Sequence, residues 1–252
     1  MEHRNIIRLL VAVAGLVMAG QPGAVELTVS AASSLTQAFK DMARRYEEMH
    51  PDAKVFVNFG ASGVLLQQIA KGAPVDVFAC ADQETMDEAV KIGLVHANER
   101  RDFATNTLVL VVPRGQSVSL GHLSELTQAA VRRIAIGNPD SVPVGRYARR
   151  ALEKAGLWEA VATKAITTQN VRQSLDYVSR GEVDAGFVYA TDAGEAADRV
   201  RIAFEVPLDV AIRYPIAPLA DAAHAEEARR FTGFVLSADG QAILASHGFP
   251  KP

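Results

Sequence analysis

Segments with strand character alternate with longer amphipathic segments along most of this chain of 252 residues. The short segments form compact apolar runs, whereas the longer ones carry apolar residues at helical spacing. This alternation favours an α/β fold with mostly parallel sheets, because each parallel pair of strands needs a crossover that a helix can supply. We predict strands at 25–31, 55–59, 75–79, 106–112, 134–136, 165–168 and 185–189, and helices at 35–50, 62–70, 83–92, 146–155, 171–179, 223–236 and 238–246.

The pattern divides the chain into two blocks and a returning tail. Three strand–helix units come first, and the hydrophobic run at 106–112 then ends in the turn sequence PRG before the alternation restarts at Ile134. The tail from residue 211 onward adds two helices but no sheet of its own, so we expect it to complete the first block. We therefore predict two α/β lobes joined by two extended crossings, with 25–105 and 216–252 in lobe 1 and 106–215 in lobe 2.

The N-terminal segment has the layout of a secretory signal peptide. Arg4 and Arg8 accompany an apolar stretch over 6–18, and small residues follow at Ala19 and Gly20. The apolar part is shorter than the roughly 20 residues that a membrane-spanning helix needs. We predict that residues 1–24 are a signal peptide, with cleavage after Ala19 or Ala24, and that the rest of the chain is exported.

Charge and cysteine content limit the partners of the exported chain. Residues 1–24 hold two basic and one acidic side chain, so 24 basic and 28 acidic side chains remain, with a formal net charge of −4. An acidic protein is a poor partner for nucleic acid or anionic membrane, and any anion site in it must be built locally. Cys80 is the only cysteine, which excludes an intrachain disulfide, and we expect it to be a small buried hydrophobe near a strand end.

Ser, Asn and Gly gather where the predicted strands give way to helices. In a doubly wound sheet, ligands bind at the carboxyl ends of the strands. A helix N-terminus there offers free N–H groups and the positive end of its dipole to an anion. Each serine taken alone is better interpreted as a helix N-cap, so an anion site requires several junctions to face one cleft. The junctions are at 31–34, 60–63, 137–145, 167–171 and 185–189.

Five runs of sequence resemble the periplasmic molybdate-binding proteins of ABC importers, in the same order along the chain. They are AASSL (31–35), FGASG (59–63), GAPVDVF (72–78), VPVGRYA (142–148) and GFVYATD (186–192). The resemblance implies a two-lobed periplasmic-binding-protein fold, also called a Venus flytrap, that closes by a hinge near Asn106 and Arg213. It also implies a periplasmic monomer that delivers its ligand to a permease and ATPase complex in the inner membrane.

The resemblance further implies which groups contact the ligand. Ser34 and Ser62 would each offer a hydroxyl and a backbone N–H, Val144 and Val171 a backbone N–H, and Tyr189 its phenol. The family often has Ala at position 144 and Ser at position 80, where this chain has Val and Cys. Because the donor at Val144 is a backbone group, that difference need not remove it. Molybdenum would be bound only as the molybdate oxyanion, and no resident cofactor is expected.

A site made only of donors suits molybdate, which is fully deprotonated at neutral pH. Hydrogen phosphate would leave its remaining proton unpaired, at a cost of roughly 1 to 3 kcal/mol when buried. Sulfate has the same charge and geometry as molybdate, so only size can separate them, and tungstate should bind much like molybdate. The function predicted from sequence is therefore capture of molybdate, and of tungstate, between the two lobes.

Three alternatives remain open at the sequence level. The first is a binding protein for another oxyanion such as sulfate or thiosulfate. The second is the sensor domain of a transcription regulator, although the signal peptide and the lack of a helix-turn-helix segment count against it. The third is an exported hydrolase, but no nucleophile, base and orienting acid can be assembled, and in GASG the second glycine follows Ser62 too early for a nucleophile elbow. We therefore expect no enzymatic activity.

Overall fold

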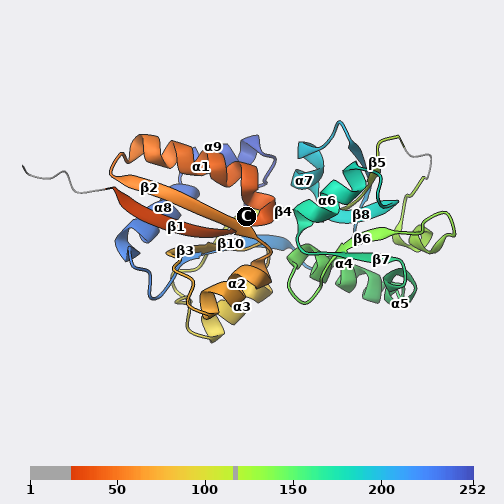
Figure 1. Cartoon of the computed structure of the whole chain (residues 1–252), viewed down its shortest axis with the longest axis horizontal. Helices are drawn as coiled ribbons and strands as arrows, with labels where there is room; N and C mark the ends of the chain where they lie inside the picture. The colour runs from red at the N-terminus through yellow and green to blue at the C-terminus, as the bar shows by residue number, and fades with distance from the viewer. Residues whose placement is uncertain (1–23, 116–118) are drawn as a thin grey trace, which may run out of the picture.

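The computed structural model describes residues 24–115 and 119–252. The predicted signal peptide falls almost entirely outside these residues. Figure 1 shows two lobes side by side, each with a central sheet and helices on both of its faces. Among the described residues, no helix is long and apolar enough to cross a membrane.

Lobe 1 is built on a five-stranded sheet of order β2-β1-β3-β10-β4. Its strands are β1 (Val25–Ala32), β2 (Ala53–Gly60), β3 (Val77–Ala79), β4 (Arg101–Asn106) and β10 (Ile212–Pro218). Its helices are the short 3-10 helix η1 (Ser33–Leu35), α1 (Thr36–Met49), α2 (Ser62–Ala70), α3 (Gln83–Lys91), α8 (Ala225–Leu236) and α9 (Ala238–Ser246). In Figure 1, α1, α8 and α9 cover one face of this sheet, and α2 and α3 cover the other.

Lobe 2 repeats the same plan with the order β7-β6-β8-β5-β9. Its strands are β5 (Leu108–Pro113), β6 (Ile134–Gly137), β7 (Ala165–Thr168), β8 (Ala185–Tyr189) and β9 (Val200–Glu205). Its helices are η2 (Leu123–Thr127), α4 (Pro143–Lys154), α5 (Trp158–Ala162), α6 (Val171–Ser179) and α7 (Ala190–Glu195). The α/β architecture and the two lobes predicted from the sequence are confirmed.

Each sheet is mixed, with a single strand running against the other four. In lobe 1, β1 pairs in parallel with β2 and β3, whereas β10 is antiparallel to both β3 and β4. In lobe 2, β6 pairs in parallel with β7 and β8, whereas β5 is antiparallel to both β8 and β9. The reversed strands β5 and β10 are the first strands after the chain changes lobes.

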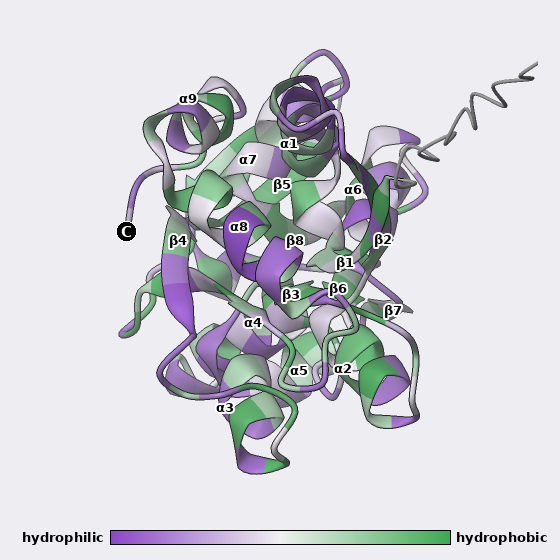
Figure 2. Ribbon diagram, turned by 90° about the vertical axis from the view of Figure 1, so that its left-hand side faces the viewer, coloured by the Kyte–Doolittle hydropathy of each residue, from purple (hydrophilic) through white to green (hydrophobic). Residues whose placement is uncertain are grey.

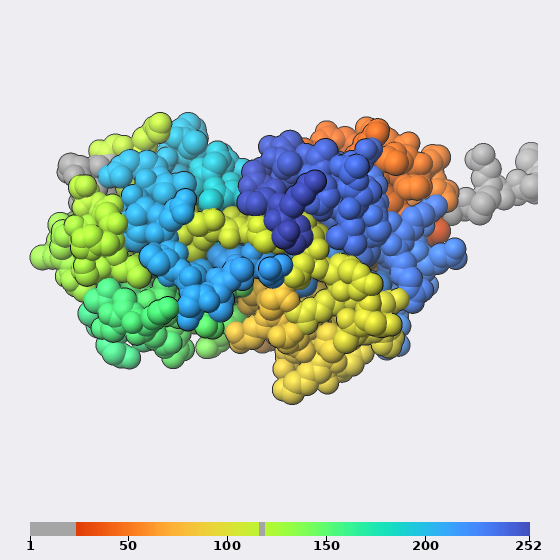
Figure 3. Space-filling view, turned by 180° about the vertical axis from the view of Figure 1, so that it is seen from behind, coloured from red at the N-terminus to blue at the C-terminus, as the bar shows by residue number. Residues whose placement is uncertain are grey.

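Two crossings join the lobes on one side of the molecule, which faces the viewer in Figure 3. The first is a single residue, Thr107, between β4 and β5, and the second spans residues 206–211, between β9 and β10. The expected end of lobe 2 at residue 215 falls inside β10, which pairs with β3 and β4 in the first sheet. The tail therefore contributes a strand to lobe 1 as well as two helices.

The core combines strand residues with the inward faces of the helices. In Figure 2, the central strand β5 is mainly green, whereas α8 is partly purple. All five residues of β8 are buried, and so are the first five of β5. Strands β4 and β9 escape sequence prediction because they lie at sheet edges and mix charged with apolar residues. Trp158 begins α5, and the Arg149 guanidinium lies 5.3 Å from the centre of the Trp158 ring.

Candidate functional site

A small cavity lies between the two lobes, where the N-termini of helices from both lobes meet. All five residues predicted as ligand contacts line it: Ser34, Ser62, Val144, Val171 and Tyr189. Ser34 belongs to η1 and Ser62 begins α2 in lobe 1, whereas Val144 lies in the first turn of α4, Val171 begins α6 and Tyr189 ends β8 in lobe 2. The structure thus brings together residues that are up to 155 positions apart in the sequence (34 to 189).

The cavity is very small, with a free volume of about 10 Å³. Sites for drug-sized organic molecules measure roughly 300 to 1,000 Å³. A space of about 10 Å³ is close to the minimum that holds a single water molecule. An occupant must therefore be compact, and an organic solute does not fit this arrangement of the lobes.

Helices α2, α4 and α6 all begin at the cavity wall, so their first N–H groups lack intrahelical partners there. Helix α4 begins at Pro143, three residues before the predicted start, and proline is well suited to this position because it has no N–H to lose. This earlier start puts Val144 in the first turn. None of the three helices has an acidic residue in its first turn, so no carboxylate competes with a bound anion.

The two serines of the site are not helix caps. Ser62 is the first residue of α2, whose N-cap is Ala61, and its Oγ accepts a hydrogen bond from the backbone N–H of Ala81 at 3.0 Å. Ser34 Oγ lies 3.1 Å from the hydroxyl of Tyr214. Both serines are almost fully buried. The alternative interpretation of these serines as N-caps is therefore wrong.

Tyr189 carries a buried hydroxyl without a partner. The side chain is 1% exposed, and its Oη atom has no hydrogen-bond partner within residues 24–115 and 119–252. Burial raises the pKa of this phenol well above its ordinary value, so the group remains a protonated donor. Because a buried hydroxyl without a hydrogen bond costs free energy, this group is the strongest indication that the cavity is built for a ligand.

The described residues that line the cavity are all uncharged. Arg172, which follows Val171 directly in α6, is a cation in contact with residues of the cavity wall. Its guanidinium donates to the backbone carbonyls of Ser33 at 3.1 Å and Ser34 at 3.2 Å, and it also pairs with Glu195. Arg172 thus links lobe 2 to the serine turn of lobe 1 while its charge is shared with a carboxylate.

Two further contacts join the lobes around the cavity. Arg146 of α4 donates to Asp82 at 2.6 and 2.8 Å and to the hydroxyl of Thr85 at 2.7 Å, and Asp82 also caps α3 by accepting from the N–H of Thr85. The N–H of Gly63 in α2 donates to the carbonyl of Ser141 in lobe 2 at 3.0 Å. The lobes are therefore in contact on several sides of the site.

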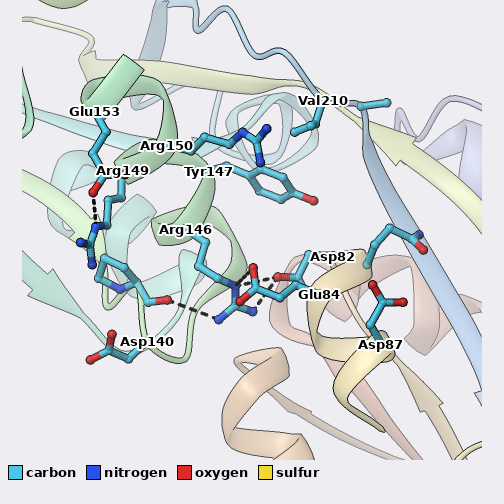
Figure 4. Close-up of a pocket in the computed structure, with 13 residues that line it drawn as sticks. Asp82, Glu84, Asp87, Asp140, Arg146, Tyr147, Arg149, Arg150, Glu153 and Val210 are labelled. Atoms are coloured by element: carbon cyan, nitrogen blue, oxygen red, sulfur yellow. Dashed lines mark hydrogen bonds and ion pairs between the residues drawn. The ribbon is translucent and has the colours of Figure 1, made fainter. Parts of the chain in front are cut away.

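Figure 4 shows the larger cleft that Arg146 borders. Its walls are α3 on one side and α4 on the other, and Val210 of the second crossing lies at its edge. Charged side chains of both signs line it, and Arg146 with Asp82 and Arg149 with Glu153 pair across or along its walls. Because five carboxylates and three arginines line this cleft, its excess of negative charge makes it a poorer candidate for an oxyanion than the smaller uncharged cavity.

Sequence reasoning missed three residues that support the site: Arg172, Asn106 and Tyr214. Arg172 could have been noticed because it follows a predicted contact, and Tyr214 because it is a hydroxyl-bearing aromatic in the mainly apolar run IRYPIAP (212–218). Buried Cys80, by contrast, is as predicted, and burial raises the pKa of its thiol well above the ordinary value. In the part of the chain that the structure describes, no group of three or more His, Cys, Asp or Glu could hold a metal ion.

The sequence of the chain matches a known protein family. The sequence profile of the family described as bacterial extracellular solute-binding protein matches residues 27–250. The chain belongs to this family. This chain is 34% identical over 212 residues to the molybdate-binding protein ModA of Escherichia coli (strain K12). The alignment covers 82% of this chain and 80% of the relative.

Solved structures agree with the fold of the solute-binding protein. The periplasmic molybdate-binding protein of Azotobacter vinelandii superposes with a TM-score of 0.80 at 22% identity, covering 90% of this chain and 99% of the other. The sulfate-binding protein SubI of Mycobacterium tuberculosis H37Rv superposes equally well, with a TM-score of 0.80 at 16% identity, covering 90% and 87%. The predicted resemblance to molybdate-binding proteins is confirmed in sequence, whereas the fold is common to proteins named for different oxyanions.

Proposed function

We propose that this protein is the substrate-binding component of an ABC importer that captures molybdate, and tungstate, through neutral hydrogen-bond donors. The observation that carries the proposal is the buried hydroxyl of Tyr189, which has no partner among the residues that the structure describes, in an interlobe cavity whose described lining is uncharged. The similarity to ModA supports the choice of ligand. As an exported protein it would work in the periplasm as a monomer and deliver the ion to the permease and ATPase complex of the inner membrane.

Each of the five predicted contact residues has a donor to offer. The hydroxyls of Ser34, Ser62 and Tyr189 and the first-turn N–H groups of Val144 and Val171 supply neutral donors from both lobes. Because the Ser62 oxygen already accepts from Ala81, its own proton remains available to the ligand. Helix N-termini add favourable dipole ends, so a dianion can lose its hydration shell without a buried Lys or Arg.

Donor-only chemistry selects among tetrahedral oxyanions by protonation. Molybdate, tungstate and sulfate only accept hydrogen bonds, whereas hydrogen phosphate must also donate one. An unpaired buried donor costs roughly 1 to 3 kcal/mol, which corresponds to about a fivefold to 150-fold loss of affinity. Phosphate should therefore bind weakly, and sulfate should be separated from molybdate by size alone.

We further propose that ligand binding closes the lobes about the two crossings at Thr107 and residues 206–211. The cross-lobe contacts of Arg146, Arg172 and Gly63 would form on closure and be lost on opening. Exclusion of water from the closed cavity strengthens each hydrogen bond to the ion. The expected hinge near Asn106 adjoins the first crossing, whereas the expected position near Arg213 lies inside β10, just past the second.

Sulfate is the second candidate ligand. The likeness in fold to a sulfate-binding protein favours it, and its charge and shape satisfy the same donors. Thiosulfate belongs to the same class. The size of the closed cavity decides between these ions, and the experiment that follows includes them.

Thermal unfolding of the exported chain with each oxyanion tests the proposal. A ligand that binds only the folded state adds RT ln(1 + [L]/Kd), or about 2.7 kcal/mol at one hundred times Kd. For a chain of this size each kcal/mol raises Tm by roughly 2 to 4 °C. We expect shifts of several degrees with molybdate and tungstate and none with phosphate at the same concentration. A larger shift with sulfate than with molybdate would favour the second candidate, and no shift with any oxyanion would refute the proposal.

A further inference from the structure

A chain of hydrogen bonds leads from the first interlobe crossing to the cavity. The Asn106 side-chain amide, at the end of β4, lies 3.2 Å from the Tyr214 hydroxyl of β10, and that hydroxyl lies 3.1 Å from Ser34 Oγ at the cavity wall. Tyr214 and Ser34 are almost fully buried, at 0% and 1% exposure. The proposed ligand chemistry uses the Ser34 hydroxyl, but it gives no role to Asn106 or Tyr214.

The orientation of the Asn106 amide is fixed by its neighbours. The backbone N–H of Thr107 can only donate, and it lies 2.9 Å from Asn106 Oδ1. The Nδ2 group must therefore face the other way, where it donates to the hydroxyls of Thr191 at 2.9 Å and Tyr214 at 3.2 Å. Tyr214 Oη consequently accepts a hydrogen bond from Asn106.

The proton of Tyr214 is then directed at Ser34. Burial keeps the pKa of the Tyr214 phenol well above its ordinary value, so the phenol retains its proton. Within residues 24–115 and 119–252, the other recorded partner of this hydroxyl is Ser34 Oγ. A phenol that accepts from Asn106 satisfies its donor by giving the proton to Ser34. The Ser34 oxygen is thereby occupied as an acceptor, and its own proton is free to point into the cavity.

We infer that Tyr214 is a positioning residue that, through the relay Asn106 to Tyr214 to Ser34, makes the Ser34 hydroxyl a donor toward a bound oxyanion. This inference rests on the proposed function, because it concerns the same cavity. Hydrogen bonds in such a chain polarise one another, so the Ser34 proton becomes a better donor than that of an isolated serine. The relay also supplies a reason for selectivity, since a serine already used as an acceptor is a poorer partner for the proton of hydrogen phosphate.

The relay is anchored in both lobes and at both crossings. Asn106 ends β4 immediately before the first crossing, Tyr214 lies in β10 shortly after the second, and Thr191 belongs to α7 of lobe 2. The pairing of β10 with β4 shifts register between Tyr214 and Pro215, which marks a local irregularity at this point of the strand. Tyr214 therefore connects the ligand contact with the segments about which the lobes would move.

The test is a double-mutant cycle between Tyr214→Phe and Ser34→Ala, with affinity for molybdate measured by isothermal titration calorimetry. Phenylalanine retains the ring, which packs edge-on against Phe103, Tyr189 and Phe249, so the variant should fold. We expect Tyr214→Phe to weaken molybdate binding about fivefold to twentyfold, as loss of one hydrogen bond that supports a charged contact does. In the Ser34→Ala background the same change should have no further effect.

A purely structural role for Tyr214 predicts a different result. The two substitutions would then weaken binding independently, and their effects would multiply in the double variant, which would overturn the inference. Unchanged affinity in Tyr214→Phe alone would overturn it as well. The selectivity readout is the ratio of molybdate to phosphate affinity, which should fall in Tyr214→Phe and stay constant if the role is structural.

The control is Tyr177→Phe, which removes a hydroxyl bonded to Gln173 outside the cavity and should leave affinity and selectivity unchanged. Failure of the proposed function is distinguishable from failure of this inference. If the unaltered protein binds no molybdate, the proposed function is wrong. If it binds molybdate but the cycle shows independent effects, only the relay is wrong.

Discussion

A methyl group at Gly63 should impede closure of the lobes without damaging either of them. The N–H of Gly63 donates to the Ser141 carbonyl across the cleft at 3.0 Å, and a Cβ added at this position would lie 2.7 Å from that oxygen and 2.9 Å from the Ser141 Cα. Both neighbours are backbone atoms of the other lobe, so no side chain can turn aside. Ordinary contact begins near 3.4 Å, so the surfaces must separate by about 0.7 Å at this point.

The expected loss of affinity follows from that separation. The Gly63 hydrogen bond is weakened or lost, which costs about 1 kcal/mol, and the neighbouring cross-lobe contacts lengthen as well. A total of roughly 1 to 3 kcal/mol corresponds to about a fivefold to 150-fold weaker binding of molybdate. The same substitution should stabilise the unliganded protein by up to about 1 kcal/mol, because alanine is the better helix former.

The prediction is specific because Gly63→Ala should lower the affinity for molybdate while raising the stability of the unliganded protein. Isothermal titration calorimetry gives the affinity of Gly63→Ala, and urea unfolding without ligand gives its stability. Gly233→Ala is the matched control, because Gly233 lies in α8 with nothing within 4 Å of the added Cβ, and it should change stability alone. Wild-type affinity in Gly63→Ala would refute closure at this contact, and a large loss of unliganded stability would show that the lobes are already joined without a ligand.

Three further predictions concern single side chains of the site. Ser62→Ala should weaken molybdate binding by roughly 1 to 3 kcal/mol, as calorimetry would show, because a hydroxyl donor to a dianion is lost; unchanged affinity would exclude that role. Tyr189→Phe should weaken binding similarly but leave the unliganded Tm equal or higher, because the removed hydroxyl has no hydrogen-bond partner among residues 24–115 and 119–252; a lower Tm would indicate that it has one. Burial raises the pKa of the Asp192 carboxyl from its ordinary 3.8 to about 6, although the charge of Arg172 partly opposes this rise. The carboxyl therefore binds its proton more tightly in the folded chain than in the unfolded chain. The protonated carboxyl therefore contributes to stability fully below about pH 4, and this contribution of at most about 3 kcal/mol is lost as the pH rises to about 6. In urea unfolding, the free energy of unfolding of Asp192→Asn should fall less across this pH range than that of the unaltered protein.

The local features of the fold were predictable from sequence where periodicity is strong. Helices α2, α6 and α9 and strands β7 and β8 have the predicted bounds, because each begins and ends at a clear change of pattern. Edge strands β4 and β9 were missed because each mixes charged with apolar residues and shows no regular alternation of buried and exposed positions. The position of β10 within the first sheet was also missed, since pairing partners across more than 100 residues leave no local signal in one sequence.

The residues that line the candidate site were predictable from sequence, but the residues that orient them were not. The resemblance supplied Ser34, Ser62, Val144, Val171 and Tyr189, and the structure gathers them at one cavity. The partners that orient them depend on tertiary contacts that only the folded chain reveals. Tyr214 approaches Ser34 from 180 residues away, and Arg172 reaches the serine turn from the opposite lobe.

The most direct test of the central claim is a crystal structure of the exported chain grown with molybdate, with the ion located by anomalous scattering of molybdenum. The donor-only account predicts one strong peak in the cavity between Ser34, Ser62, Val144, Val171 and Tyr189, with each of these residues within hydrogen-bond distance of an oxyanion oxygen. It also predicts that no Lys or Arg side chain contacts the ion. A peak in the charged cleft beside Arg146, or an ion held by a cationic side chain, would contradict the account.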